Sequence, residues 1–245
     1  MASVLILGSG PNVTEARDWP RDFDLILAIN NAWAVRPDWD ELIHAYDFAP
    51  ERMPPVVGAG QRIVTEAEFV PAQNALGGFV YAGGTMAFTA AYYALDAHRP
   101  RVLAFFGCDM VYPSCGRTHF YGTGSPDPLR ADPTLQSLEA KSARLMVLAA
   151  RAGCAAVNLS TTPSRLVLQR TQRADWRDAT PLPFDMALTE MALTREKTLD
   201  YHVASGRYWE EIDRFDPAEL RALDAMWLAA AGIDASTLPS AGSGA

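Results

Sequence analysis

Short apolar runs, each followed at once by glycine or polar residues, constrain this chain more than any other feature of its sequence. They cover residues 3–7, 23–29, 41–45, 101–106 and 154–159, and residues 62–65 form a candidate sixth run. Runs that are apolar at consecutive positions are typical of strands covered on both faces, as in parallel sheets.

Two predicted helices lie between these runs. Residues 82–97 are rich in alanine and aromatic side chains, and residues 133–151 are amphipathic, with Leu138, Leu145 and Leu148 on one face. Strands that alternate with helices along a chain form parallel sheets with right-handed crossovers. The sequence therefore predicts an α/β fold in which helices sandwich a parallel sheet.

The composition changes after about residue 168. Residues 169–183 are polar and contain Pro181 and Pro183, which is typical of a linker, and residues 186–201 and 217–231 have helical patterns. The last ten residues are rich in serine, glycine and alanine. We expect a sheet domain over residues 1–170, a small helical extension over 171–235 and a flexible tail over 236–245.

Composition excludes several classes of protein. Of the 245 residues, 49% are hydrophobic and 20% charged, as in globular proteins, and a net charge of −8 disfavours nucleic-acid binding. Cys108, Cys115 and Cys154 lack the spacing of a zinc site or a disulfide framework. With neither a signal peptide nor a membrane span expected, the sequence predicts a cytoplasmic protein with reduced thiols.

The first apolar run ends in the turn Gly8-Ser9-Gly10-Pro11-Asn12. Glycines after a strand let backbone N–H groups approach a phosphate or nucleotide closely, although they also serve any tight strand-to-helix turn. The turn lacks the third glycine of the dinucleotide fingerprint and the Gly-Lys of a P-loop. Contact with a nucleotide and a purely structural turn both stay open.

Polar side chains also follow the second and third runs. Asn30 and Asn31 carry amides that both donate to and accept from a base or a sugar hydroxyl, and Asp47 can bind a hydroxyl or an amine. Turn formation or helix capping would explain the same residues. Because the carboxyl ends of parallel strands share one edge of a sheet, we expect them to lie near the Gly8 turn.

The residues Gly83-Gly84-Thr85 open the predicted helix over 82–97. A helix N-terminus presents free N–H groups and the positive end of the helix dipole, which together form a ready anion site. Close packing of helix on sheet is the alternative reason for the two glycines.

The fourth run ends in Gly107-Cys108-Asp109, and a loop with Tyr112, His119 and Tyr121 follows. Aspartate and histidine are residue types that transfer protons, so we predict His119 as a general base and Asp109 as the group that orients it. The tyrosines can hydrogen-bond a phosphate or a sugar. A surface histidine and packed tyrosines are the structural alternative.

Taken together, these motifs resemble the bacterial sialyltransferases that use CMP-activated sugars. The order of parts is similar: a G-x-G-P-[SN] turn, an asparagine after the second strand, a turn that opens a helix, and a G-x-D-[MF] strand end. The resemblance is strongest to a related uncharacterised domain of flagellin-modifying nonulosonate transferases and phage genomes, which carries an H-[FW]-x-G loop, here His119-Phe-Tyr-Gly122. It covers about residues 3–170.

The resemblance implies a modified Rossmann fold that binds a cytidine nucleotide at residues 8–12, Asn30 and the Gly84 turn, with tyrosines near the phosphate. It implies metal-independent transfer of an acidic sugar of the sialic or nonulosonic type to a hydroxyl acceptor on a glycan or small molecule, with inversion. No cofactor is implied beyond the donor itself.

The sequence departs from the family at two points. The family's catalytic histidine lies in the segment that corresponds to residues 127–136, which contains none here, so only His119 is in reach. The family's [ST]-G dipeptide is replaced by Gly83-Gly84.

Two alternatives stay open. A pterin pyrophosphokinase-like nucleotidyl or phosphoryl transferase would use magnesium held by acidic residues such as Asp47 and Asp109. A non-catalytic protein would bind a nucleotide only, or use Tyr208, Trp209 and Trp227 of the C-terminal helices to dock a partner or a second copy of the chain.

Overall fold

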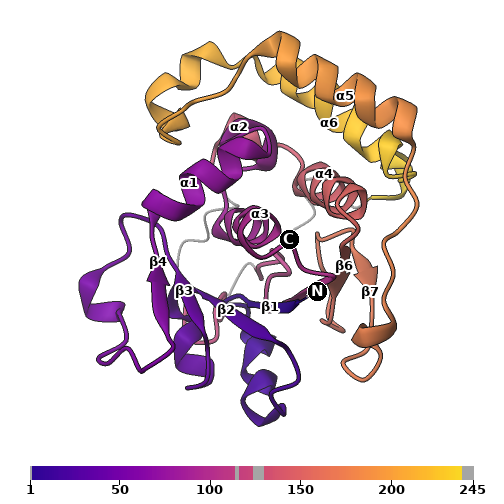
Figure 1. The fold of residues 1–245 in the computed structure, drawn as a ribbon. Coiled ribbons are helices and arrows are strands. Elements are labelled where there is room, and N and C mark those ends of the chain that lie inside the picture. Colours follow the sequence, from indigo (N-terminus) through magenta and orange to yellow (C-terminus); the bar gives the residue numbers. More distant parts are fainter. Residues whose placement is uncertain (1, 114–115, 124–129, 239–245) are drawn as a thin grey trace.

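The computed structural model describes residues 2–113, 116–123 and 130–238, so Cys115 and most of the predicted tail lie outside the described residues. A seven-stranded, all-parallel sheet with the order β4-β3-β2-β1-β5-β6-β7 forms its centre (Figure 1). This confirms the predicted α/β, Rossmann-like fold. The strands are β1 (Ser3–Leu7), β2 (Leu25–Ile29), β3 (Glu41–Ile43), β4 (Arg62–Val64), β5 (Val102–Phe106), β6 (Ala155–Asn158) and β7 (Gln169–Arg170).

The order of the strands reverses at β1, which pairs with β2 on one side and β5 on the other. Leu7, the last residue of β1, lies in register with Ala28 of β2 and Phe106 of β5. The three strands therefore end almost level. In open parallel sheets, ligands bind beyond the strand ends at such a switch point.

Alternate residues of the strands β1 to β6 enter two hydrophobic cores, one on each face of the sheet. Val4 and Ile6 of β1 lie in the core beneath the α-helices, whereas Leu5 and Leu7 lie in the core on the opposite face. The opposite face is covered mainly by 3₁₀ helices, Pro11–Asp18 and Asn30–Val35, rather than by α-helices. All five residues of β1 are buried, as its continuous apolar run predicts.

Six α-helices lie together on one side of the sheet (Figure 1). Thr65 and Glu68 form a capping box at the start of the first helix, and Ser137, Asp185 and Asp216 cap three others. The helices are α1 (Glu66–Ala75), α2 (Phe79–Ala82), α3 (Met86–His98), α4 (Leu138–Arg151), α5 (Met186–Leu199) and α6 (Pro217–Ala230).

The structure corrects three predicted elements. The helix expected from residue 82 begins at Met86, because Gly83 has a φ of 87° and ends α2 instead. The helix expected from residue 133 begins at Leu138, after a 3₁₀ turn at Pro133–Leu135. The linker expected over 169–183 begins with strand β7, and its Trp176 stacks on Phe23 in the core at 4.2 Å.

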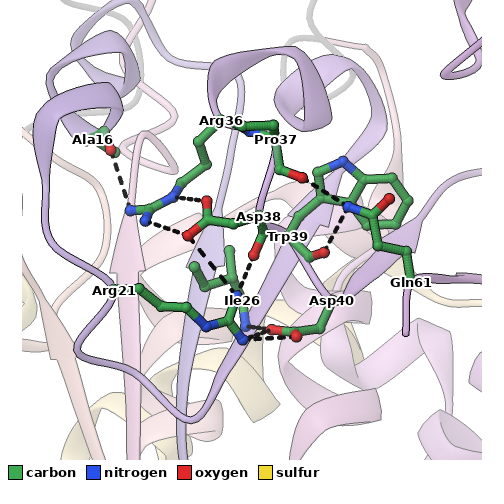
Figure 2. A network of polar contacts seen from close by, with 9 residues as sticks. All are labelled: Ala16, Arg21, Ile26, Arg36, Pro37, Asp38, Trp39, Asp40 and Gln61. Atoms are coloured by element: carbon green, nitrogen blue, oxygen red, sulfur yellow. Dashed lines mark hydrogen bonds and ion pairs between the residues drawn. The ribbon is translucent and has the colours of Figure 1, made fainter. Parts of the chain in front are cut away.

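Side-chain bonds fix the N-terminal ends of β2 and β3 (Figure 2). Asp40 accepts the Ile26 N–H at 2.7 Å and two hydrogen bonds of 2.7 Å from Arg21. Gln61 donates to the carbonyls of Pro37 and Trp39 at 2.8 and 2.9 Å. This network holds the loops at the edge of the sheet where β2 and β3 begin, opposite the edge where the strands end.

The C-terminal helices α5 and α6 form an outer layer against α2 and α4 (Figure 1). Trp227 and Tyr208 are only 1% and 2% exposed, so these aromatic residues pack into the protein rather than forming an open docking surface. Trp209 is 44% exposed and stacks on Tyr46. Among the described residues, no helix has the length and apolar character that crossing a membrane requires.

Two buried ion pairs join this outer layer to α4. Arg144 of α4 donates from Nε and Nη2 to both carboxylate oxygens of Glu196 in α5, at 2.7 and 2.8 Å, and also bonds the Tyr92 hydroxyl and the Leu76 carbonyl. Lys141 donates to Asp224 of α6 at 2.7 Å. A buried charge is tolerated only when it is fully paired, so the layer and the sheet domain depend on each other.

We predict that Glu196→Gln lowers the free energy of unfolding by about 3–5 kcal/mol, because it leaves the Arg144 charge buried without its counter-ion. Urea unfolding measures the change. Glu190→Gln is the matched control, since Glu190 pairs with Arg151 between the same two helices at the surface, where such pairs contribute about 0–1 kcal/mol. Equal, small losses in both variants would contradict this role for the buried pair.

Candidate active site

A cavity of about 530 Å³ opens beyond the ends of β1, β2 and β5. It is the place where the strand order reverses. The structure brings ten of the predicted site residues into its wall: Gly8, Ser9, Gly10, Asn12, Asn30, Thr85, Asp109, Tyr112, His119 and Tyr121. Asn31, Asp47, Gly83 and Gly84 are not part of this wall.

The Gly8 turn (residues 8–12) lies directly against the loop after β5. The Gly8 N–H donates to the Phe106 carbonyl at 2.9 Å, and the Gly10 N–H donates to the Gly107 carbonyl at 2.8 Å. A Cβ on Gly8 would lie 2.3 Å from the Gly107 oxygen, and one on Gly10 would lie 2.8 Å from it. The glycines are therefore required for two loops to meet, and the turn that they form also lines the cavity.

Asp109 joins the loops that follow β1, β5 and β6. Its buried carboxylate accepts hydrogen bonds from Asn12 (3.0 Å), Ser160 (2.7 Å), Thr162 (3.2 Å) and Asn158 (3.2 Å). Four neutral donors satisfy the lone pairs of this carboxylate, and their loops are held together as a result. The expected orientation of His119 by Asp109 stays a prediction.

Asn30 lines the cavity and combines an unusual backbone conformation with an unsatisfied side-chain oxygen. Its φ is 51°, a left-handed conformation that asparagine tolerates better than most residues. Its Oδ1 is buried and has no hydrogen-bond partner among the described residues. A buried acceptor without a partner is costly, and a hydrogen-bond donor that reached this oxygen would remove that cost.

The loop that carries His119 is anchored to the Gly8 turn. The Phe120 N–H donates to the Ser9 carbonyl at 3.0 Å, and the His119 N–H donates to the Gly122 carbonyl at 3.0 Å. The His119 ring stacks on Tyr121 with centroids 5.0 Å apart, and its Nδ1 shares a hydrogen bond of 2.9 Å with the Thr118 hydroxyl. The centroid of the Tyr112 ring lies 6.1 Å from that of the His119 ring.

The N-terminus of α3 also faces the cavity, but Gly83 and Gly84 do not line it. Thr85 caps the helix by accepting the Phe88 N–H, and Met86 and Ala87 of the first turn line the cavity. The Gly84 N–H instead donates to Thr134 Oγ1 at 3.2 Å. The N–H groups of Gly83 and Gly84 are therefore bonded within the protein, whereas those of Met86 and Ala87 have no partner inside the helix.

Sequence reasoning missed Arg52 and the residues after β6. Arg52 lines the cavity from the loop after β3, and no carboxylate among the described residues pairs with it. No local pattern marks an arginine in a proline-rich loop. Asn158 ends the buried strand β6, and Ser160 and Thr162 follow it closely, so a signal like that of Asn30 was present in the sequence.

A second cavity of about 410 Å³ lies on the other side of the α3 N-terminus and shares Thr85 and Met86 with the first. Asp47 and Gly84 line it, together with Arg130, Asp132 and Tyr208. Asn30 follows β2 and Asp47 follows the neighbouring strand β3, but the two residues lie in the walls of different cavities.

Burial raises the pKa of the Cys108 thiol, and the Asp109 charge raises it further. Cys108 is therefore protonated at neutral pH and is a packing residue at the strand end. The described residues contain no group of three or more histidine, cysteine, aspartate or glutamate side chains arranged to hold a metal ion.

Comparison of the chain with protein-family models, curated proteins and solved structures finds no match.

Proposed function

We propose that this protein is a glycosyltransferase that binds a CMP-activated acidic sugar in the first cavity and transfers the sugar to a hydroxyl acceptor. The observation that carries the proposal is the unpartnered Asn30 Oδ1 beside the Gly8 turn, at the switch point of a parallel sheet. An amide oxygen in this position accepts a hydrogen bond from the amino group of a base or from a ribose hydroxyl.

The phosphate of the donor has its own set of binding groups. The N–H groups of Met86 and Ala87 stand at the positive end of the 13-residue helix α3, which favours an anion. Arg52 adds a positive charge to the same wall and suits either the phosphate or the carboxylate of an acidic sugar. Binding of an anion by a protein with a net charge of −8 requires local groups of this kind.

His119 supplies the proton acceptor for the transfer. When Nδ1 carries its hydrogen and donates to Thr118, the ring's Nε2 is the nitrogen that accepts a proton. The acceptor hydroxyl oxygen then bonds to the anomeric carbon, the bond from that carbon to the CMP phosphate oxygen breaks, and the hydroxyl proton passes to Nε2. Direct displacement of this kind inverts the anomeric centre.

The geometry favours the alternatives less. Asp47 and Asp109 lie in the walls of different cavities, and the Asp109 carboxylate already accepts four hydrogen bonds, so the two do not form the magnesium pair of a nucleotidyl transferase. Burial of Tyr208 and Trp227 removes two of the aromatic residues that a docking role would use. Assembly with further copies and a cytoplasmic location stay predictions.

We predict that the wild-type protein binds CMP and that Asn30→Gly weakens binding about five- to tenfold, the effect of one lost hydrogen bond. Glycine keeps the positive φ that this position needs. Isothermal titration calorimetry measures both affinities. Asn31→Gly is the matched control and keeps the wild-type affinity, because Asn31 does not line the cavity. Absence of CMP binding at millimolar concentration would refute the proposal that this cavity binds a cytidine nucleotide.

We predict that His119→Asn slows CMP release from CMP-N-acetylneuraminic acid in the presence of an acceptor about 10²- to 10⁴-fold, as expected for loss of a general base. The wild-type rate should be unaffected by a chelator of divalent metals. His202→Asn, at an exposed histidine of the C-terminal extension, is the control and keeps the wild-type rate. A His119→Asn variant with undiminished turnover would exclude this residue as the base.

A further inference from the structure

Tyr208 connects the C-terminal extension to the wall between the two cavities. It opens a 3₁₀ segment, Tyr208–Arg214, between α5 and α6, and it is 2% exposed. Its hydroxyl donates to Asp132 Oδ2 at 2.7 Å and accepts from Arg130 Nη2 at 2.5 Å. A tyrosine from the outer layer thus bonds two residues of the segment before α4.

Tyr208, Arg130 and Thr134 surround the backbone of Gly84. The hydroxyl of Tyr208 comes so close that a Cβ on Gly84 would lie 1.9 Å from it. Arg130 Nη2 donates to the Gly84 carbonyl at 2.8 Å. Thr134 accepts the Gly84 N–H at 3.2 Å and is itself fixed by a hydrogen bond of 2.7 Å from its own N–H to Asp132 Oδ1. We call Tyr208, Arg130, Asp132 and Thr134 the Gly84 clamp.

The protonation states of the clamp favour these bonds at neutral pH. Burial would raise the pKa of Asp132, but hydrogen bonds from Thr134, Tyr208 and Arg130 outweigh this effect and lower it below its usual value. Burial raises the pKa of Tyr208, and the neighbouring Asp132 charge adds to the rise. A charged carboxylate therefore accepts from a neutral phenol.

Gly84 is separated by one residue from the first turn of α3. Thr85, the capping residue, follows Gly84 directly, and Met86 and Ala87 come next in the wall of the first cavity. The backbone at Gly84 therefore sets where the first N–H groups of the helix lie relative to a bound anion. Positioning errors well below 1 Å affect hydrogen bonds to a ligand.

We propose that Tyr208 is a positioning residue of the phosphate site, which makes the C-terminal extension a working part of the nucleotide cavity. The proposal rests on the function proposed above, because the phosphate of CMP is the group that meets the α3 N-terminus. It also assigns a role to a part of the chain that lies outside the family resemblance.

The test compares the affinities for CMP and cytidine, which differ by the phosphate alone. Tyr208→Phe removes the clamp hydroxyl and keeps the ring, and Thr134→Val removes the acceptor of the Gly84 N–H. We expect each variant to bind CMP about three- to tenfold more weakly than the wild type and to bind cytidine within twofold of it. Calorimetry on the full chain gives two dissociation constants for each of the three proteins and hence three ratios of CMP affinity to cytidine affinity.

Tyr81→Phe is the matched control. Tyr81 is also buried and also ties the outer layer to the sheet domain, because its hydroxyl donates to the Glu196 carbonyl at 2.7 Å and accepts the Tyr201 N–H at 2.8 Å. It does not touch the Gly84 turn through these bonds. We expect Tyr81→Phe to lower the melting temperature and to leave the ratio of CMP affinity to cytidine affinity unchanged.

If both clamp variants keep the wild-type ratio of CMP affinity to cytidine affinity, even with both affinities lowered equally, Tyr208 has only a structural role. This result would overturn the positioning role of Tyr208 and leave the proposed function standing. A wild-type protein that binds neither compound would overturn the proposed function and this inference together. A lowered ratio in Tyr81→Phe would also count against the clamp, because any loosening of the outer layer would then suffice.

Discussion

The carbonyl oxygen of Gly107 comes so close to the Gly8 turn that only glycine fits at two positions of that turn. The rest of the site depends on this contact. Because β1 and β5 are neighbours in register, the loops that follow them leave the sheet at the same height and must pass each other backbone to backbone. The cavity lies beside this contact, and a hydrogen bond of 3.0 Å from Asn12 of one loop to Asp109 of the other holds the two loops together.

Three further connections stabilise the cavity from outside. The Asp109 carboxylate gathers the loops after β1 and β6, the Ser9 carbonyl holds the His119 loop, and the Gly84 clamp holds the start of α3. Each connection uses hydrogen bonds between segments that are distant in the sequence. A preorganised wall of this kind lowers the entropy that ligand binding would otherwise cost.

Most of the sheet was predictable because its strands are buried on both faces and read as apolar runs. Strand β7 was not, since its two residues, Gln169 and Arg170, are polar and pair only at the edge of the sheet. The start of α3 was placed too early because the positive φ of Gly83 depends on neighbours far along the chain, among them Lys141. Helix α1 was not predicted, although the capping box of Thr65 and Glu68 is a local signal that marks its start.

The residues of the cavity wall were predictable where they closely follow a strand, as Gly8, Asn30 and Asp109 do. Nothing in the sequence distinguishes Asn30 from Asn31, because only the turn of the 3₁₀ helix decides which of the two faces the cavity. No local sequence pattern marks Arg52 or Tyr208 as a cavity residue. They reach the cavities through a proline-rich loop and through the packing of the C-terminal layer on α4, and both depend on contacts between distant segments.

The central claim is that the first cavity is a nucleotide site, and a crystal structure of the protein soaked with CMP tests it most directly. The structure predicts density between the Gly8 turn and the first turn of α3, with a ligand donor on Asn30 Oδ1 and the phosphate at the N–H groups of Met86 and Ala87. Density for CMP elsewhere on the molecule, with this cavity empty, would contradict the claim.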